Sequence, residues 1–359
     1  MEKKALIAMS GGVDSSVAAL LCQQAGFDCM GVTLKLYDNE DAGLPREKTC
    51  CSVDDVADAR SVAFRLGMPF YVFNFKEGFR REVMDRFVQA YERGETPNPC
   101  VDCNRYIKFE KLMRRGEEVG FPYIATGHYA RVEFDGAAGR WLLKKGLDEN
   151  KDQSYMLWSL TQWELSRLLL PLGGLTKERV RQLAEEHGFL NARKRDSQDI
   201  CFVPDGDYAA FIRRYAGKEF PPGAFVGTQG QVYGQHKGII HYTVGQRKGL
   251  GLSFPQPMFV KELDVEKNRV VLAKAEELFS QEVIARDINL ISVESIPAPL
   301  RVKARVRYRQ KEQPATVLQT GPDELRVVFD QPQRAVTPGQ SLVLYDGDTV
   351  VGGGKIARK

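Results

Sequence analysis

The stretch from Ser10 to Ser16, with the sequence Ser-Gly-Gly-Val-Asp-Ser-Ser, constrains the fold more than any other part of the chain. It follows directly on the apolar run Ala5–Met9 and leads into the apolar-rich run Val17–Leu21. This order predicts a strand, a tight glycine turn and a helix N-terminus. Glycines let a ligand approach the backbone closely, and the free N–H groups and dipole of a helix N-terminus favour negative charge. The sequence therefore predicts an anion-binding loop after the first strand.

Strands and helices alternate over residues 1–200. Strands are predicted at residues 5–9, 30–34, 70–74 and 123–126, with helical stretches such as 53–66 between them. Such alternation indicates a parallel sheet with helices on both faces, in which ligands bind at the C-terminal ends of the strands. Gly127 and His128 follow the fourth predicted strand, so we expect them at the same edge of the sheet as Ser10–Ser16.

The texture of the sequence changes after residue 200, where prolines and glycines become frequent and short strand-like runs replace the helices. From about residue 281 the runs are typical of antiparallel strands, predicted at residues 300–308, 315–319, 324–329 and 341–345. We therefore predict three domains. They are an α/β domain with a doubly wound parallel sheet at 1–200, a small, mostly β central domain at 201–280, and an antiparallel β-barrel at 281–359.

The bulk properties are those of a globular protein. The chain has 359 residues, 43% of them hydrophobic and 27% charged, which suits two or three domains. No stretch is long and apolar enough to span a membrane and no secretory signal is evident, so we expect a cytoplasmic protein. The seven cysteines form no disulfide framework. Cys22 and Cys29 are expected in the core, and no chemistry is assigned to Cys50 and Cys51.

A run of cations near the C-terminus has a period of two. The cations are Arg301, Lys303, Arg305, Arg307, Arg309 and Lys311, and no acidic residue interrupts them. Because side chains alternate along a strand, all six are expected on one face. Like charges gathered in this way repel one another, which favours a polyanion partner such as RNA. The alternative is a solvated outer face, the usual origin of alternating charge.

Three further cysteines lie in polar surroundings. Cys100 and Cys103 form a Cys-x-x-Cys pair in the proline-rich turn 96–104, before a predicted helix, and Cys201 follows the cationic run Arg193–Arg195. A helix N-terminus lowers the pKa of a nearby thiol. A zinc site usually needs four protein ligands, and the sequence has no second Cys-x-x-Cys pair. The interpretations left open are an iron–sulfur cluster, a nucleophile with a persulfide carrier, and a structural role.

The loop at Ser10–Ser16 resembles the SGGxDS loop of the ATP pyrophosphatases, which transfer AMP to a substrate oxygen. It lacks the Gly-Lys-Ser/Thr of P-loop enzymes. The whole chain resembles the bacterial tRNA-specific 2-thiouridylase family, which uses ATP and persulfide sulfur to convert the C2 oxygen of the tRNA wobble uridine to sulfur. The motifs that carry this resemblance are SGGVDSS at 10–16, CCSVDD at 50–55, TPNPCVDCN at 96–104, ATGHYAR at 125–131, KDQSYML at 151–157, DSQDICF at 196–202 and YTVGQRKGLG at 242–251.

The resemblance implies a role for each matching residue. Residues implied in ATP binding are Ala8, Met9, Ser10, Gly11, Gly12, Val13, Asp14, Ser15, Leu34 and Gly127. Cys103 would be the nucleophile, and Cys201 would carry the terminal persulfide sulfur. Residues implied in tRNA binding are Asn98, Pro99 and Cys100 beside the target base, and His128, Lys151, Asp152, Gln153, Arg307, Tyr308 and Gln340 elsewhere.

The implied reaction uses ATP with Mg²⁺, tRNAs for Lys, Glu and Gln, and a persulfide donor such as a cysteine desulfurase or a sulfur-relay protein. Asp14 is expected to help hold Mg²⁺, the alternative being a cap on the first helix. Many family members have Asp at the position of Cys100. The three-cysteine form resembles relatives with a four-iron four-sulfur cluster, for which Cys100, Cys103 and Cys201 are candidate ligands, although the persulfide account is favoured. Rival interpretations are a lysidine-type or amide-forming ATP pyrophosphatase acting on tRNA, and a non-catalytic tRNA-binding module.

Overall fold

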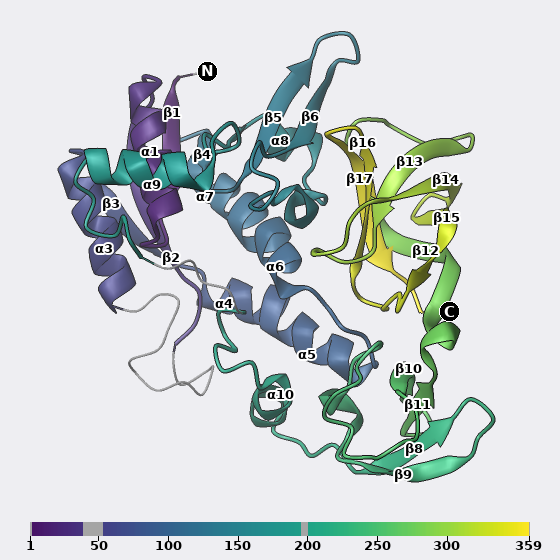
Figure 1. Cartoon of the computed structure of the whole chain (residues 1–359). Helices are drawn as coiled ribbons and strands as arrows, with labels where there is room; N and C mark the ends of the chain where they lie inside the picture. Colours follow the sequence, from purple (N-terminus) through teal and green to yellow (C-terminus); the bar gives the residue numbers. More distant parts are fainter. Residues whose placement is uncertain (1, 39–52, 195–199, 359) are drawn as a thin grey trace. The chain divides into compact units, whose positions relative to one another are not determined.

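The computed structural model describes residues 2–38, 53–194 and 200–358 (Figure 1). The chain forms two compact units, each of which collects segments from distant parts of the sequence. Unit 1 comprises Met1–Met84, Pro99–Gly206 and Gly347–Val351, and unit 2 comprises Asp85–Asn98, Asp207–Asp346 and Gly352–Lys359. The chain therefore passes between the units at five points, after residues 84, 98, 206, 346 and 351.

A parallel sheet of five strands forms the centre of unit 1, in the order β3-β2-β1-β4-β7. Its strands are β1 (Lys4–Ala8), β2 (Asp28–Lys35), β3 (Phe70–Asn74), β4 (Tyr123–Ala125) and β7 (Leu168–Leu169). The chain adds β2 and β3 on one side of β1 and then β4 and β7 on the other. The strand order thus reverses beside β1, and in such sheets ligands bind outside the C-terminal ends of the strands at this reversal. The predicted doubly wound fold is confirmed.

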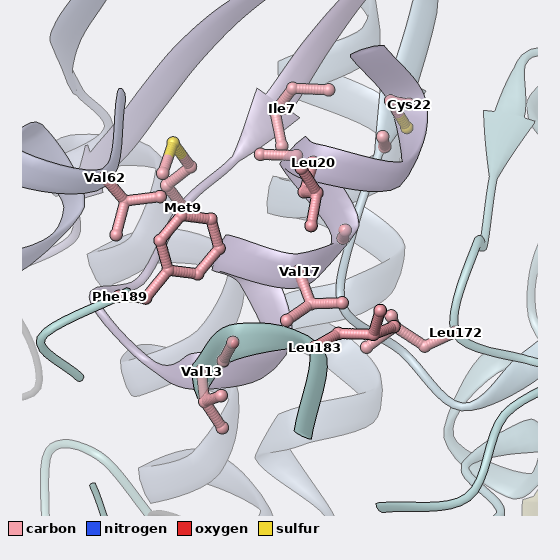
Figure 2. Packing of buried hydrophobic residues seen from close by; sticks show 14 of the residues in the cluster. Ile7, Met9, Val13, Val17, Leu20, Cys22, Val62, Leu172, Leu183 and Phe189 are labelled. Atoms are coloured by element: carbon pink, nitrogen blue, oxygen red, sulfur yellow. The ribbon is translucent and has the colours of Figure 1, made fainter. Parts of the chain in front are cut away.

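Three helices complete the core of unit 1, namely α1 (Val13–Gln24), α3 (Val53–Arg65) and α9 (Lys177–Glu186). Helix α1 contacts β1, α3 and α9, and eight of its twelve residues are buried. Figure 2 shows Val17 and Leu20 of α1 packed with Ile7 and Leu183. A helix buried on most of its circumference is fixed firmly in position. This packing therefore sets where the N-terminus of α1 lies.

The core of unit 1 also holds the two thiols that the sequence placed there. Cys22 on α1 and Cys29 on β2 are both buried, with 3% and 5% of their surface exposed. Burial raises the pKa of the Cys22 thiol to about 12 and that of Cys29 to about 11. Neither thiol is reactive at neutral pH, as expected for core residues.

Two helical runs of unit 1 contain wider π-helical turns. The first consists of α4 (Lys76–Phe79) and η1 (Arg80–Met84) and continues into unit 2 as α5 (Asp85–Glu92). The second consists of α6 (Pro99–Asp102), η2 (Cys103–Lys111) and α7 (Leu112–Glu118). The π-helical segments η1 and η2 contact each other. Because π-turns are rare and frequently lie at functional sites, the position of Cys103 at the start of η2 is consistent with a functional role.

The remaining elements of unit 1 include the antiparallel hairpin of β5 (Ala130–Asp135) and β6 (Arg140–Lys145). Thr349, in the part of β17 that belongs to unit 1, pairs with Lys144 of β6. Two short helices follow the hairpin, η3 (Ser154–Leu157) and α8 (Gln162–Leu165). Throughout the described residues, no helix is both long and apolar enough to cross a lipid bilayer.

Unit 2 contains two β structures. The middle sheet has the order β10-β11-β8-β9. Its strands are β8 (Gly223–Gly227), β9 (Val232–His236), β10 (Phe259–Asp264) and β11 (Arg269–Ala273). Three short helices belong to the same part of the chain, α10 (Tyr208–Ala216), η4 (Ile239–His241) and η5 (Ala275–Leu278). The C-terminal barrel has the order β12-β15-β14-β13-β16-β17 and closes through pairing of β12 with β17. Its strands are β12 (Phe279–Leu290), β13 (Leu300–Arg305), β14 (Gln313–Gly321), β15 (Glu324–Arg334), β16 (Ser341–Asp346) and β17 (Thr349–Ile356).

The predicted antiparallel barrel is confirmed, with one difference in length. The strand predicted at 300–308 ends at Arg305, because the chain turns after this residue instead of continuing the ladder with β14 and β16. The boundaries predicted at residues 200 and 280 stay predictions. Segment 85–98 lies in unit 2, although it was expected within the N-terminal domain.

Candidate active site

The loop between β1 and α1 is held in a compact turn by its own hydroxyl groups. Ser15 Oγ donates to Gly12 O at 2.9 Å and accepts from the Ser10 N–H at 3.2 Å. Ser16 Oγ donates to the same carbonyl at 3.1 Å. Gly12 is the N-cap of α1, and no side chain among the described residues caps this helix. The first amides of a buried, uncapped helix suit an anionic ligand.

Two glycines allow the backbone to pack closely around this loop. Gly11 has a φ of +77°, and a Cβ there would lie 2.8 Å from Asp55 Cα. A Cβ on Gly127 would lie 2.7 Å from the carbonyl carbon of Asp14. Leu34 lies on β2, two residues beyond Val32, the partner of Ala8 on β1. The structure thus gathers the residues implied in ATP binding at one sheet edge, beside the reversal of strand order.

The carboxylate of Asp14 is occupied by two side chains of unit 1. Lys177 Nζ lies 2.8 Å from each carboxylate oxygen, and Tyr129 Oη donates to Oδ1 at 2.7 Å. The Lys177 side chain is only 8% exposed and that of Asp14 is 28% exposed. Asp14 lies in the first turn of α1, one residue after Val13, and the N-cap position itself is Gly12. Because Lys177 engages both oxygens, this donor set does not fit a Mg²⁺ site.

Asn191 holds the other side of the loop. Its Nδ2 donates to Gly11 O and to Ser16 Oγ, both at 2.9 Å. The residue is 4% exposed, and its Oδ1 accepts no hydrogen bond from any residue that the structure describes. Lys177 and Asn191 are 163 and 175 residues from their partners Asp14 and Ser16 in the sequence. Both escaped sequence reasoning, since no local pattern marks a contact across such a separation.

The Cys-x-x-Cys pair lies at the start of the second helical run. Helix α6 begins at Pro99, earlier than predicted, so Cys100 lies in its first turn and Cys103 opens the π-helical segment η2. Proline suits the first helical position because it lacks the N–H that would have no partner there. Cys100 is exposed, whereas Cys103 is 9% exposed. Asn98, just before the helix, belongs to unit 2.

Cys201 lies in a turn of unit 1 whose backbone is anchored on both sides. Tyr37 Oη donates to Cys201 O at 2.6 Å, and the buried ring of Phe202 meets Phe79 of α4 edge-on at 5.8 Å. Helix α4 contacts η2, the segment that Cys103 opens. The turn of Cys201 and the segment that begins with Cys103 thus both contact α4. Cys50, Cys51 and Arg195, together with Ser197, Gln198 and Asp199, lie outside the described residues.

Within the described ranges, no three or more His, Cys, Asp or Glu side chains are grouped to hold a metal ion. The candidate cluster ligands differ in exposure, since Cys100 is exposed, Cys103 is buried and Cys201 is intermediate. The iron–sulfur alternative therefore has no support from the geometry of the described thiols.

Residues implied in tRNA contact from unit 1 mostly make internal hydrogen bonds. His128 Nδ1 lies 2.7 Å from Thr126 Oγ1, and burial together with the charge of Lys108 holds the pKa of His128 well below its usual range. His128 is therefore neutral at pH 7 and offers no positive charge to a phosphate. Asp152, 7% exposed, accepts from the Gly146 N–H at 3.1 Å. Lys151 and Gln153 are half-buried beside it.

The basic run in unit 2 is less positive than its sequence suggests. Arg301 pairs with Asp330 at 2.7 Å, and Arg305 pairs with Glu312 at 2.9 Å. Arg307 Nη2 donates to Ala335 O at 2.9 Å. The expectation of six cations on one strand face is wrong, because β13 ends at residue 305 and carboxylates from neighbouring segments neutralise two of the six. The period-two alternation itself is confirmed as far as residue 306, with the even positions buried.

Two other residues implied in tRNA contact lie in unit 2. Gln340 Nε2 donates to Thr96 O at 2.7 Å, two residues before Asn98. Tyr308 is half-buried, just beyond the end of β13. The internal bond of Gln340 fixes the irregular segment that leads to the Cys-x-x-Cys pair, a positional role that its place in the sequence did not reveal.

Comparison with known proteins follows this architecture along the whole chain. Residues 3–205 match a family described as the tRNA methyl transferase HUP domain, residues 209–274 its PRC-barrel domain, and residues 280–356 the aminomethyltransferase beta-barrel domain. The tRNA-specific 2-thiouridylase MnmA of Clostridioides difficile (strain 630) is 50% identical over 358 residues, which cover 100% of this chain and 99% of that protein. This chain belongs to the tRNA-specific 2-thiouridylase family. The family resemblance of the sequence motifs is thereby confirmed.

A second family relative, tRNA-specific 2-thiouridylase MnmA 1 of Thermoanaerobacter sp. (strain X514), is 51% identical over 357 residues, covering 99% of this chain and 98% of that protein. Similar solved structures include a 4-thiouridine synthetase–RNA complex with bound ATP, with a TM-score of 0.36 and 21% identity over 56% of this chain and 45% of that chain. NMN synthetase from Francisella tularensis has a TM-score of 0.33 and 15% identity over 61% of this chain and 78% of that chain.

Proposed function

We propose that this chain is a tRNA-specific 2-thiouridylase that uses ATP and persulfide sulfur to convert the C2 oxygen of the tRNA wobble uridine to sulfur. The observation that carries the proposal is the identity of 50% and 51%, over essentially full length, with two relatives of that name. We further propose tRNAs for Lys, Glu and Gln as its substrates. The cytoplasmic location stays a prediction.

The first half-reaction activates the uridine. The C2 oxygen attacks the α-phosphorus of ATP, pyrophosphate leaves, and C2 then carries AMP as a good leaving group. The uncapped amides at the start of α1 and the two glycines before it suit the developing phosphate charge, since fixed N–H donors need no reorganisation during the reaction. We propose residues 8–15, Leu34 and Gly127 as the ATP contacts. Mg²⁺ stays a prediction, because Asp14 is occupied by Lys177.

The second half-reaction transfers sulfur. A persulfide on Cys201 attacks C2, AMP leaves, and a C2–S–S–Cys201 linkage forms. The Cys103 thiolate then attacks the Cys201 sulfur, which breaks the S–S bond and releases the thiolated base. The two cysteines end as a disulfide, which supplies the two electrons gained by the transferred sulfur. An external thiol reductant restores them, and a persulfide donor reloads Cys201. We propose a cysteine desulfurase or a sulfur-relay protein as that donor.

The target base must leave the anticodon stack to reach these groups, which an unpaired loop nucleotide does at low cost. We propose Asn98, Pro99 and Cys100 as its neighbours, since they lie at the start of the helical run that carries Cys103. Further proposed tRNA contacts are His128, Lys151, Asp152, Arg307, Tyr308 and Gln340. Where Cys100 replaces the Asp of other family members, we assign no proton transfer to the thiol.

The decisive experiment is mass spectrometry of tRNA after incubation with the protein, ATP and a low-molecular-weight persulfide. Replacement of one oxygen by sulfur at the wobble uridine is expected, and its loss is expected in Cys103→Ser and in Cys201→Ser. Cys100→Ser separates the two sulfur mechanisms, because a persulfide relay through Cys103 and Cys201 survives it and a three-cysteine cluster does not. Release of AMP without any change in tRNA mass would contradict the proposed function.

A further inference from the structure

Residues Asp152–Met156, which we name the strap, are hydrogen-bonded to elements of both reaction centres within unit 1. One attachment reaches Tyr129, which supports Asp14 in the nucleotide loop. The other reaches Asn104, the residue after the proposed nucleophile Cys103. The family resemblance implies a tRNA contact for Gln153 and no role for Asn104. The contacts in the structure assign both residues a different task.

The first attachment is a double hydrogen bond between Gln153 and Tyr129. The Tyr129 N–H donates to Gln153 Oε1 at 3.0 Å, and the Gln153 N–H donates to Tyr129 O at 2.9 Å. Tyr129 is 2% exposed, and its hydroxyl donates to Asp14 Oδ1 at 2.7 Å. Gln153 therefore fixes the backbone of the tyrosine whose ring end holds the nucleotide loop.

The strap itself is rigid. Asp152 Oδ1 accepts from the Ser154 N–H at 3.1 Å, and Oδ2 accepts from Ser154 Oγ at 3.0 Å. Ser154 is fully buried, and the Met156 N–H donates to Gln153 O at 2.9 Å, which closes the turn of η3. A short segment with a buried centre and this many internal bonds transmits position from one end to the other.

The second attachment is a single bond to the nucleophile helix. Asn104 Nδ2 donates to Met156 O at 3.1 Å, and the residue is 3% exposed. Its Oδ1 accepts no hydrogen bond from the described part of the chain. The amide of Asn104 is thus directed at the strap through its nitrogen, one residue from the Cys103 sulfur.

We propose that Gln153 and Asn104 are positioning residues that hold the nucleophile helix in register with the nucleotide loop. This inference rests on the proposed function, in which the carbon activated by ATP and the sulfur of Cys103 must meet in one geometry. Small misplacements of reacting groups lower the rate of the chemical step more than they lower binding. The strap is therefore expected to affect kcat, and the side chain of Gln153 is not expected to affect the affinity for tRNA.

The first test separates kcat from binding. Gln153→Ala and Asn104→Ala are each expected to lower kcat for thiolation about tenfold, the upper range for one lost hydrogen bond, with the Kd for tRNA changed less than twofold. Gln153→Glu keeps an acceptor for the Tyr129 N–H and should recover most of kcat. The matched control is Gln162→Ala, which removes a similar amide clamp on the Trp141 backbone. A raised Kd for tRNA with unchanged kcat in Gln153→Ala would overturn the proposal.

The second test needs no thiolation activity. Alkylation of Cys103 by iodoacetamide is followed by mass spectrometry of the tryptic peptide 94–105, with and without ATP. Cys22 and Cys29, whose pKa values burial raises, stay unlabelled as internal controls. ATP should change the alkylation rate at least twofold in the wild type and in Gln162→Ala, and should have no effect in Gln153→Ala or Asn104→Ala, although each still binds ATP.

The outcomes of the two tests are separable. The same ATP response in the wild type and in both strap variants, or no response in the wild type, would refute the positioning role. If wild-type protein makes no 2-thiouridine while the alkylation rates respond to ATP as expected, the proposed function is refuted and the positioning role of the strap is supported. Thermal unfolding of every variant within about 2 °C of the wild type shows that the losses are local.

Discussion

The ion pair between Asp14 and Lys177 permits a prediction with a definite asymmetry. The Lys177 side chain is 8% exposed, whereas that of Asp14 is 28% exposed and also accepts the Tyr129 hydroxyl. Three variants test it, namely Asp14→Asn, Lys177→Met and the two changes combined. Asp14→Asn leaves a buried ammonium without this carboxylate, while Lys177→Met leaves a carboxylate that water and a hydroxyl still reach. We expect Asp14→Asn to be the more destabilising of the single changes.

The magnitude follows from the geometry. Unit charges 2.8 Å apart attract by about 6 kcal/mol at an effective dielectric constant of about 20. The cost of burying the ammonium offsets much of this attraction, so loss of the carboxylate costs about 3 kcal/mol and loss of the ammonium about 1–2 kcal/mol. The double variant removes the stranded charge and should cost about 1–2 kcal/mol, less than Asp14→Asn alone. At about 2–4 °C per kcal/mol, Asp14→Asn lowers the unfolding midpoint by about 6–12 °C.

The three tryptophans make the assay specific to unit 1. Trp141, Trp158 and Trp163 are the only tryptophans of the chain, and all lie in unit 1. Their fluorescence during thermal unfolding therefore follows the unit that contains the pair, and each variant is measured beside the wild type at the same salt concentration. Equal effects of the two single changes, or a double variant as unstable as their sum, would refute the reasoning. If the pair also serves the nucleotide, the double variant stays inactive despite its recovered stability.

Three further predictions concern single positions. Gly11→Ala should weaken ATP binding more than tenfold because its methyl meets the backbone at a φ of +77°. The control is Gly26→Ala, where φ is +80° and an added Cβ would meet no atom within 4 Å. This variant should lose only about 1 kcal/mol of stability. Isothermal titration with ATP distinguishes the two variants, because only Gly11→Ala should bind ATP more weakly. Arg307→Gln should lower the stability of unit 2, because Arg307 Nη2 donates to Ala335 O. As Arg307 is a proposed tRNA contact, the same change should reduce the slope of tRNA affinity against salt by about one, and the exposed Lys303→Gln should do so too if the basic run contacts phosphate. Burial depresses the pKa of His128 in the folded protein. As the pH falls below about 6.5, the unfolded chain therefore gains a proton that the folded chain does not, and the free energy of unfolding decreases. Thermal unfolding followed by tryptophan fluorescence should show this loss of stability from pH 7.5 to 5.5, and a smaller loss in His128→Gln.

The parts of the fold that the sequence predicts are those that local patterns determine. The strand at 70–74 matches its predicted bounds, and the other three early strands differ by one to two residues at their ends. Periodicity and turn residues act over a few positions, which is why they reveal these elements. The edge at which the glycine loop and Gly127 meet also follows from sequence, because a parallel sheet places the ends of β1 and β4 together.

The contacts that the sequence could not predict join residues far apart in the chain. Asp14 was expected to hold Mg²⁺, but Lys177 lies against it from 163 residues away. Arg301 and Arg305 were expected to repel one another, but carboxylates on other segments pair with them. The charge pattern along a sequence predicts which side chains share one face of a strand. It does not predict which opposite charges the fold brings to that face from distant segments.

Strand β17 has a consequence for the order in which the protein can form. Its residues Thr349–Val351 complete unit 1 and its residues Gly352–Ile356 complete unit 2. During synthesis residues 1–206 emerge long before Thr349, so unit 1 lacks the β17 partner of Lys144 until that residue is made. A stop codon shortly before residue 347 would therefore leave both units unfinished, and proteolysis of such truncated chains is expected to reach the β5–β6 hairpin as readily as the barrel.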